Sequence, residues 1–428
     1  MTNDQAGAAA VPFTARKLAV FNLVLGVDHV FGCLGLFSLM PVLGVLLSRQ
    51  TSGGSMVVGT GLFIYTAAAG ISALLVNHWL PRFPYVVGMT AGLCLSALGF
   101  GLLPYVHGPV PLVALLAVAG LGVSIHFILS RVMIAELVTD DIGRHRIYSM
   151  LQIAVNIAAA IGPFAASLLY STGSDGRLLL GLVALSYVLA AVSLLFGLPR
   201  GLRPPPTSGQ WPISRAALMS VLRHRIGLRV VVTTVTGSFL YAQFFSAFAL
   251  LVAHEIRTGA VRAVLLAGPA VTIVALQTAV TAVVSRLMKR GLRPLVMLGS
   301  ATLMFAAAMA LLGFGLPVAV AAGVSVAVFS VAEMLFTPMV STAFAGLPIA
   351  SSLEAFNIRQ VSWTLGEALG SLSGGALFLF CYEHGHQGTY WLVLAGVTAV
   401  GMPLLLLSAR SRTDAQESAA PLSASATK

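Results

Sequence analysis

Residues 18–47 read LAVFNLVLGVDHVFGCLGLFSLMPVLGVLL, an apolar run that holds one acid, Asp28, and one histidine, His29. A helix crosses a bilayer with about 20 apolar residues, so this run predicts a transmembrane helix that tilts or protrudes. It follows the basic pair Arg16 and Lys17 and is too long for the core of a signal peptide. The chain is therefore predicted to enter the membrane with its first long helix.

The rest of the chain has the same character. Of its 428 residues, 58% are hydrophobic and only 9% are charged, and the mean hydropathy is +0.95. A soluble globular body needs a far denser charged surface, so a soluble enzyme is excluded. The 43 glycines agree with helices that pack closely inside a membrane.

The apolar segments number twelve, six on each side of a polar stretch. They lie at 18–47, 55–76, 84–105, 110–137, 147–171, 177–198, 228–254, 263–285, 292–313, 316–340, 353–381 and 388–408. We predict an all-α polytopic membrane protein with twelve transmembrane helices in two pseudo-symmetric six-helix bundles, 18–198 and 228–408. A cytoplasmic N-terminus (1–17), a cytoplasmic linker (199–227) and a cytoplasmic tail (409–428) complete the chain.

The net charge of +11 takes its meaning from where the 24 basic residues fall. Eighteen fall on the side of the N-terminus, and only four fall in the loops of the other side: Arg49, Arg177, Arg257 and Arg262. This asymmetry predicts that both termini are cytoplasmic. We therefore expect contact with the lipid bilayer and none with nucleic acid. Only three of the 24 are lysines, which is typical of a GC-rich bacterial genome and favours a bacterial inner (plasma) membrane.

An internal repeat links the two halves at an offset of 208 residues. Without gaps, Gln152, Ala160, Gly162 and Leu169 fall on Gln360, Ala368, Gly370 and Leu377. The match pairs the fifth predicted helix of one half with the fifth of the other.

Three short motifs lie on the first, fifth and tenth helices. They are LGLFSLMPVL with Leu34, Gly35, Pro41 and Val42, NIAAAIGPFAAS with Gly162 and Pro163, and AEMLFTP with Glu333, Met334, Leu335 and Pro338. On these residues the chain resembles the major facilitator superfamily over about residues 16–410, most closely its twelve-helix drug and proton antiporter group. The resemblance implies transport by alternating access.

Two other motifs of that family are degraded. The loop signature between helices 2 and 3 falls on ALLVNHWLPR, where Asn77 and His78 replace an acid and an arginine while Arg82 is kept. The arginine usual in helix 4 falls on Leu116. Proton coupling must therefore use other groups.

An ionised side chain in the bilayer is expensive and usually faces a cavity or a partner. Asp28 lies 11 residues beyond Lys17, about 16 Å along a helix and near the midplane. We expect proton coupling or substrate contact from Asp28, with a structural hydrogen bond as the alternative. His29 should point about 100° away around the helix, which favours packing or a water contact.

The eleventh helix carries Arg359, Trp363 and Glu367 at spacings of four, so a cation, an aromatic ring and an acid should line one wall. Glu367 is a candidate for function, and Arg359 is one with snorkelling as the alternative. Glu333 is as consistent with an inter-helix contact as with a proton site.

Helix 4 adds two candidates. Arg131 is expected to snorkel towards the helix end, near Glu136 and Asp140, with a cavity role as the alternative. His126 lies deeper and could titrate near neutral pH or be a hydrogen-bonded core residue. Uncharged polar residues that could bond a substrate or another helix are Gln152, Asn156, Gln243 and Gln277.

The outer loop CYEHGHQG gathers possible metal ligands at Cys381, Glu383, His384 and His386, but their spacing matches no strong site. We expect a solvated loop, no metal and no cofactor.

The sequence contains no G-x4-G-K-[S/T], H-E-x-x-H or G-x-S-x-G motif, so we do not expect an enzyme. We predict a secondary active transporter, acting as a monomer, that exports a small amphipathic or hydrophobic organic compound in exchange for protons. Uptake by proton symport is the alternative, and a non-transporting polytopic protein is a further one.

Overall fold

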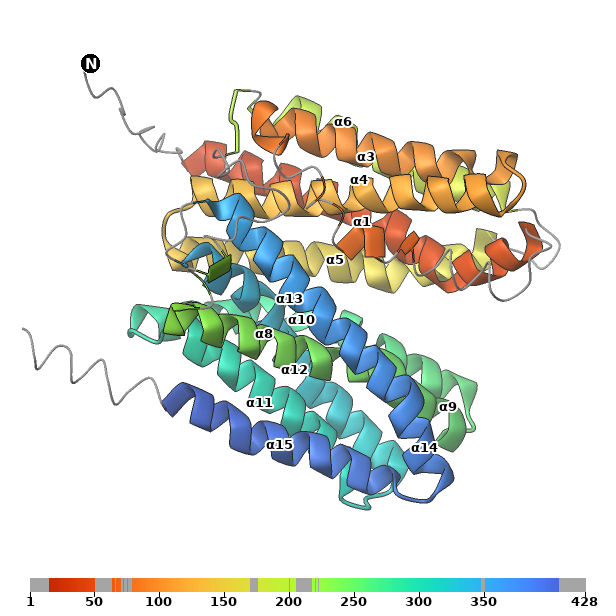
Figure 1. Cartoon of the computed structure of the whole chain (residues 1–428), viewed down its shortest axis with the longest axis vertical. Coiled ribbons are helices and arrows are strands. Elements are labelled where there is room, and N and C mark those ends of the chain that lie inside the picture. The colour runs from red at the N-terminus through yellow and green to blue at the C-terminus, as the bar shows by residue number, and fades with distance from the viewer. Residues whose placement is uncertain are drawn as a thin grey trace, which may run out of the picture.

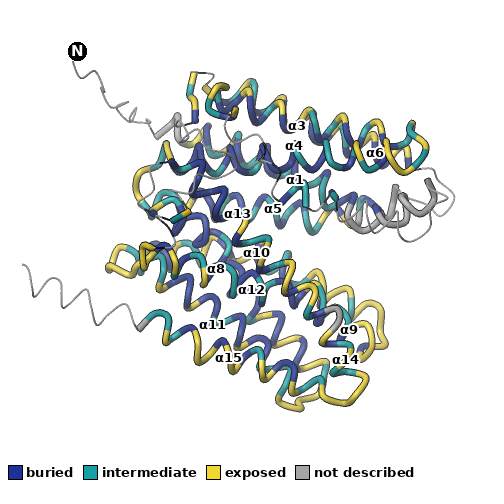
Figure 2. The backbone as a smooth tube through the Cα atoms, in the orientation of Figure 1, coloured by how far each residue is buried: buried dark blue, intermediate teal, exposed yellow. Residues whose placement is uncertain are grey.

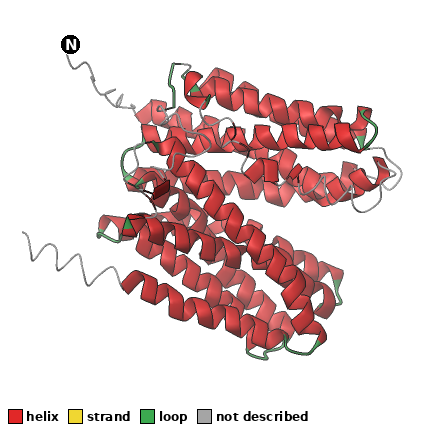
Figure 3. Ribbon diagram, viewed as in Figure 1, coloured by secondary structure: helices red, strands yellow, loops and turns green. Residues whose placement is uncertain are grey.

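The apolar segments fold into helices throughout the described part of the chain. The computed structural model describes residues 15–50, 64–65, 67–70, 72, 75, 79–169, 176–199, 201–204, 218–219, 221, 223–347 and 351–407. Within these residues every regular element is a helix and none is a strand (Figure 3).

The described residues of the first half include five long helices: α1 (Ala15–Gln50), α3 (Tyr85–Leu102), α4 (Pro109–Leu137), α5 (Asp141–Leu169) and α6 (Arg177–Gly197). Short 3-10 turns, η2 (Leu80–Arg82) and η3 (Leu103–Tyr105), flank α3. Pro109 begins α4, where a missing N–H costs nothing, and follows Gly108, whose φ of 89° favours glycine.

The second half contains α8 (Arg225–Gln243), η4 (Phe244–Phe248), α9 (Ala249–Glu255), α10 (Gly259–Lys289), α11 (Pro294–Gly313), α12 (Val318–Ala345), α13 (Ser352–Leu372), η5 (Ser373–Leu377), α14 (Phe378–Glu383) and α15 (Gln387–Leu407). The predicted helix at 55–76, the loop residues Asn77 and His78, most of the linker 199–227 and the tail 409–428 lie largely or wholly outside the described residues.

The prediction of an all-α polytopic membrane protein is confirmed. Nine of the described helical segments are long and apolar enough to cross a membrane. The long helices α5 and α13 correspond to the predicted spans at 147–171 and 353–381. These two helices carry the internal repeat, and both lie where the halves meet.

The helices form two groups with separate apolar cores. One core is built from α1 and α3–α6 together with Leu353 and Phe356 of α13, and the other from α8–α15. Figure 1 shows the second group sloping away from the first towards the right, and Figure 2 shows the buried faces turned inward within each group. Between the groups α5 packs against α10 and α12, and α4 packs against α13.

One end of the molecule is closed by contacts between the groups. Arg144 of α5 donates to the Ala135 carbonyl of α4 at 2.9 Å and to the Ala345 carbonyl of α12 at 3.2 Å. The last carbonyls of a helix lack intrahelical partners, so one guanidinium caps helices of both groups. Beside it, the Ser352 hydroxyl of α13 donates to the Glu136 carboxylate of α4.

The predicted helices at 228–254 and 353–381 are not continuous α-helices. Each is interrupted by a five-residue π-helical turn, η4 or η5. The two turns lie against each other, because a Cβ at Gly374 of η5 would collide with the Ser246 hydroxyl of η4. Hydropathy does not distinguish a π turn from an α turn, so no hydropathy pattern predicts these two turns.

Gly162 brings α5 directly onto α1. A Cβ at this position would lie 2.7 Å from the backbone carbon of Phe37 and 2.8 Å from the Ser38 nitrogen. The next residue, Pro163, lies inside α5 and is exposed. This motif contributes to packing because Gly162 lacks a side chain, and not because the motif is polar.

We predict that Gly162→Leu wedges α1 from α5, while Gly181→Leu, with no atom within 4 Å of its Cβ position, is tolerated. Overpacking of this kind costs about 1–3 kcal/mol. Thermal unfolding of the purified proteins should show a lower midpoint for Gly162→Leu alone. Equal midpoints for the two variants would contradict the packing argument.

Candidate functional site

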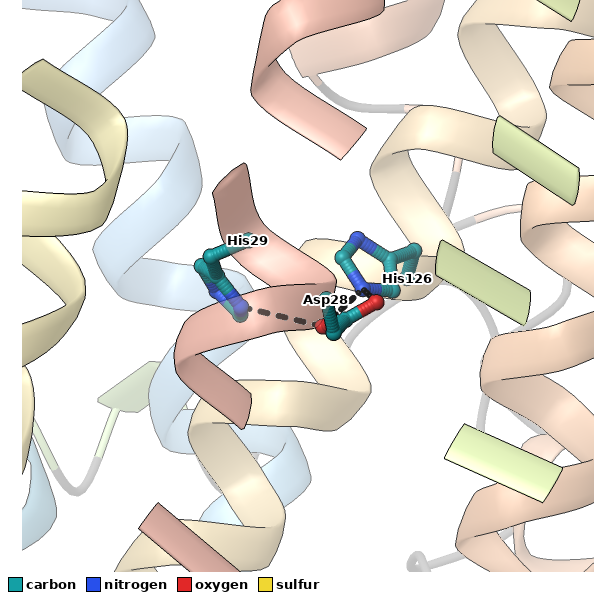
Figure 4. A group of neighbouring side chains, drawn as sticks. All are labelled: Asp28, His29 and His126. Carbon is teal, nitrogen blue, oxygen red and sulfur yellow. Dashed lines mark hydrogen bonds and ion pairs between the residues drawn. The ribbon is translucent and has the colours of Figure 1, made fainter. Parts of the chain in front are cut away.

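Asp28 lies midway along α1 with no exposed surface and contacts two histidines. The Nε2 of His126 on α4 lies 2.8 Å and 3.0 Å from the two carboxylate oxygens. The Nδ1 of His29 lies 3.0 Å from Oδ2 (Figure 4). All three side chains are buried. We call Asp28, His29 and His126 the acid–histidine cluster.

Hydrogen positions in this cluster follow from its acceptors. His29 Nδ1 also lies 3.0 Å from the Leu25 carbonyl, which can only accept, so Nδ1 carries a hydrogen. His126 Nε2 faces both oxygens of Asp28 and donates to them as long as the carboxylate is ionised. The Ser130 hydroxyl lies 3.4 Å from His29 Nε2 and extends the network along α4.

The expectation that His29 points away from Asp28 is wrong. The backbone does turn by about 100° per residue, but the imidazole folds back over its own helix to the carbonyl one turn earlier. From there its Nδ1 reaches the carboxylate of the preceding residue. The direction of the backbone alone does not predict this contact, because the side-chain rotamer decides it.

The donor atoms of the acid–histidine cluster lie within 4.8 Å of one another, a spacing that a metal ion can use. Ligands around a tetrahedral zinc at about 2.0–2.2 Å lie roughly 3.3 Å apart. Here the nitrogen–oxygen distances are 2.8–3.0 Å, the length of hydrogen bonds. The geometry fits a shared proton better than an ion.

A second buried acid joins the two groups of helices. The Gln152 amide of α5 donates to Glu333 Oε1 of α12 at 3.1 Å, and both side chains are buried. Pro338 lies one turn further along α12 and is also buried. Glu333 therefore sits in the contact between the groups.

The stripe predicted on the eleventh helix is present on α13. The Arg359 guanidinium lies over the Trp363 ring at 5.4 Å, and the Trp363 indole N–H donates to Glu367 at 3.2 Å. Arg359 does not snorkel, because its side chain is only 3% exposed.

Arg131 points away from the end of α4. Its Nη1 donates to the Phe127 carbonyl at 3.3 Å, one turn back towards the helix middle, and the guanidinium lies over the Phe127 ring. Glu136 and Asp140 bond elsewhere, to Ser352 and to the Gly143 amide. The snorkelling expectation for Arg131 is therefore not met.

The two glutamines of the second half make contacts between helices. Gln243 donates to the Gly370 carbonyl at 3.0 Å and accepts from the Tyr390 hydroxyl at 2.7 Å. Gln277 donates to the Met334 carbonyl at 3.0 Å. These bonds use Gln243 fully, whereas the Gln277 side-chain oxygen has no partner.

The first-helix motif also packs. A Cβ at Gly35 would lie 2.6 Å from the Ser186 hydroxyl and 2.8 Å from the Tyr187 ring of α6. Pro41 continues α1, and its surroundings lie outside the described residues.

Buried titratable groups inside two packed groups of membrane helices define a class of protein, the multi-pass carriers. The model of the Major Facilitator Superfamily matches residues 29–352. The chain belongs to this superfamily, and the protein is a secondary transporter of a small molecule.

Solved structures with the same fold are distant in sequence. The human organic anion transporter MFSD10 is 15% identical with a TM-score of 0.64, over 90% of this chain and 99% of its own. The fucose:proton symporter FucP of E. coli is 15% identical with a TM-score of 0.66, over 91% and 98%. A POT family transporter bound to a thioalcohol-conjugated peptide is 14% identical with a TM-score of 0.64, over 90% and 95%. No curated protein matches the chain. At these identities the likeness shows the fold alone.

We predict that His126→Ala destabilises the protein by about 3 kcal/mol, because it leaves the Asp28 carboxylate buried with one imidazole. In an Asp28→Asn background the same change should cost less than half as much, since no charge is left unpaired. Equilibrium unfolding in mixed micelles measures this double-mutant cycle. Equal costs in the two backgrounds would show that the pair is not coupled.

Proposed function

We propose that the protein is a proton-coupled antiporter that exports a small amphipathic organic compound by alternating access, with the acid–histidine cluster as its proton site. The observation that carries this proposal is that the partners of Asp28 are two imidazoles rather than an arginine or a lysine.

The chemistry of the cluster supports a proton site. A carboxylate held by a guanidinium keeps its charge over the whole physiological range, whereas imidazoles gain and lose a proton near neutral pH. Three interacting groups share their protons and titrate as a unit. Adding one proton would change the hydrogen bonds that join α1 to α4, without leaving an uncompensated charge in the bilayer.

The position of the cluster supports a link to conformational change. Asp28 belongs to α1, which packs along α5, and His126 belongs to α4, which packs against α13. Both α5 and α13 lie in the contact between the groups. A proton that altered the α1–α4 hydrogen bonds would therefore act on the helices packed against α5 and α13. These two helices must move when the groups part. Glu333, bonded across that contact to Gln152, is a second proton site in this proposal.

The direction of coupling rests on the fifth-helix motif. Its Gly162 contact with α1 has the close packing that the resemblance to antiporters implies. Proton symport is the second candidate, because the fold is shared with a fucose:proton symporter and the same cluster would serve either direction. The sign of the proton flux that accompanies substrate distinguishes them.

We predict that Asp28→Asn loses proton-driven accumulation and keeps downhill exchange, because the amide resembles a protonated acid. The measurement uses proteoliposomes loaded with a pH-sensitive dye. The substrate comes from an export screen, with and without a protonophore, in cells lacking their own efflux pumps. Glu383→Gln, a change at an exposed acid, is the control. Unchanged proton flux in Asp28→Asn would reject the cluster and direct attention to Glu333.

The closed end supports alternating access. With the predicted orientation, Arg144, Glu136 and Ser352 lie on the cytoplasmic side, so the described state faces outward. To open inward, the protein must part these contacts between the groups.

We predict that a disulfide between Glu136→Cys and Ser352→Cys stops transport and that reduction restores it. The pair is placed in a background in which Cys33, Cys94 and Cys381 are replaced by alanine or serine. Each single cysteine variant should transport with or without oxidant. Full transport by the cross-linked protein would refute movement at this end.

A further inference from the structure

Two arginines, one from each group of helices, lie close together between the groups without an acid. Arg131 belongs to α4 and Arg359 to α13, two helices that pack against each other. The two side chains are near enough for their positive charges to repel each other. Both act on the Tyr148 side chain, whose hydroxyl donates to the Arg131 carbonyl at 3.0 Å and whose ring lies 6.4 Å from that of Phe356 on α13.

Arg359 is poorly satisfied for a buried guanidinium. Its side chain is 3% exposed, and its polar contact is a 3.3 Å bond from Nη1 to the side-chain oxygen of the neighbouring Gln360. The Nε hydrogen has no partner at all. A buried polar group without a partner lowers the stability of the protein by about 1–3 kcal/mol, and by more when it is charged. This guanidinium can therefore gain stability by binding a hydrogen-bond acceptor.

Three acids of α1, α12 and α13 are already bonded elsewhere. Asp28 is held by its histidines, Glu333 by Gln152 and Glu367 by the Trp363 indole. Among the described residues no carboxylate lies within ion-pair distance of Arg131 or Arg359. Two cations on packed helices without a counter-ion attract an anion from outside the chain.

We propose that the substrate is an amphipathic organic carboxylate whose carboxylate group binds between Arg131 and Arg359. The inference rests on the proposed transport function and names its substrate class. A guanidinium presents two parallel N–H groups to a carboxylate, the strongest hydrogen-bonding arrangement available to this group. Because the arginines come from opposite groups of helices, the bound anion would hold the two groups together.

The apolar part of the substrate has an aromatic wall beside the arginine. Trp363 lies under Arg359, and its ring is 5.5 Å from Tyr241 and 5.6 Å from Phe336. Glu367 lies two turns beyond Arg359 on the same stripe and would repel a second negative charge. The aromatic wall and Glu367 together therefore favour a substrate with one anionic end and an apolar or cationic remainder.

The test measures binding to the purified full-length protein in detergent by ligand-induced thermal shift. The probes are benzoate, phenylacetate, indole-3-acetate and octanoate, each paired with its primary amide. We expect at least one acid to bind about tenfold or more tightly than its amide. We expect Arg359→Gln and Arg131→Gln each to weaken that acid about 10- to 100-fold while leaving the amide unchanged, and Arg359→Lys to recover part of the loss.

Arg177→Gln is the matched control, because Arg177 also lies over an aromatic ring, that of Tyr105 at 5.8 Å, but at the outer end of α6. This variant should bind like the wild type. If Arg359→Gln does not yield a monodisperse protein, Arg131→Gln carries the same expectation, and Arg359→Lys should show a smaller loss than Arg131→Gln.

Acids that bind no better than their amides, or a preference that survives both arginine-to-glutamine changes, would overturn the assignment. The assay uses no proton gradient, and Asp28→Asn should keep the preference for acids. Failure of anion recognition is therefore distinguishable from failure of proton coupling.

Discussion

The burial of ionisable groups among apolar helices is the constraint on which the rest of this structure depends. A charge inside the bilayer is tolerated only with a partner, and three acids of the membrane helices here have specific ones. Asp28 is held by histidines, Glu333 by an amide and Glu367 by an indole. None of the three is held by an arginine. Acids with neutral or titratable partners can change their protonation, whereas acids locked to a guanidinium cannot do so as readily. Because none of these three acids is paired with a guanidinium, Arg131 and Arg359 remain available for another anion.

The same constraint accounts for the place of α5 and α13 in the structure. Helix α5 buries Gln152 and Asn156, and α13 buries Arg359. Lipid would exclude their polar faces, but the two groups of helices cover them. Their polar residues face protein, and their glycines allow close approach, as Gly162 does to α1 and Gly370 does to the Phe239 carbonyl of α8. A polar interface between two apolar groups can part and re-form, because water can replace its hydrogen bonds when it opens.

Hydropathy and the positions of charges predicted the class of fold, because each membrane span needs about 20 consecutive apolar residues and such runs are visible in the sequence. The stripe Arg359–Trp363–Glu367 was predictable too, since helical spacing alone aligns it. The contact between Asp28 and His126 was not, because 98 positions separate the two residues and no local pattern joins α1 to α4. Side-chain rotamers decided the remaining differences. His29 folds back to its partner and Arg131 turns towards the helix middle, and neither direction follows from the position of the residue on its helix.

The proposed proton site and the pair of arginines are neighbours, which constrains how they would act together. Ser130, next to Arg131, contacts His29, and the charge of Arg131 acts on that histidine. A proton on the cluster and a carboxylate between the arginines have opposite charges, so each would stabilise the other. Electrostatics alone would then favour movement of the two together, as in symport. An antiporter with this site must therefore separate them by conformation, binding the anion in one state and the proton in the other. The hydrogen bond between Gln152 and Glu333 joins the two groups of helices, so it breaks when they part. If Glu333 were protonated only in that parted state, it would take up a proton after the anion has left, and the two binding events would be separated. The direction of transport would then be set by Glu333 rather than by the cluster.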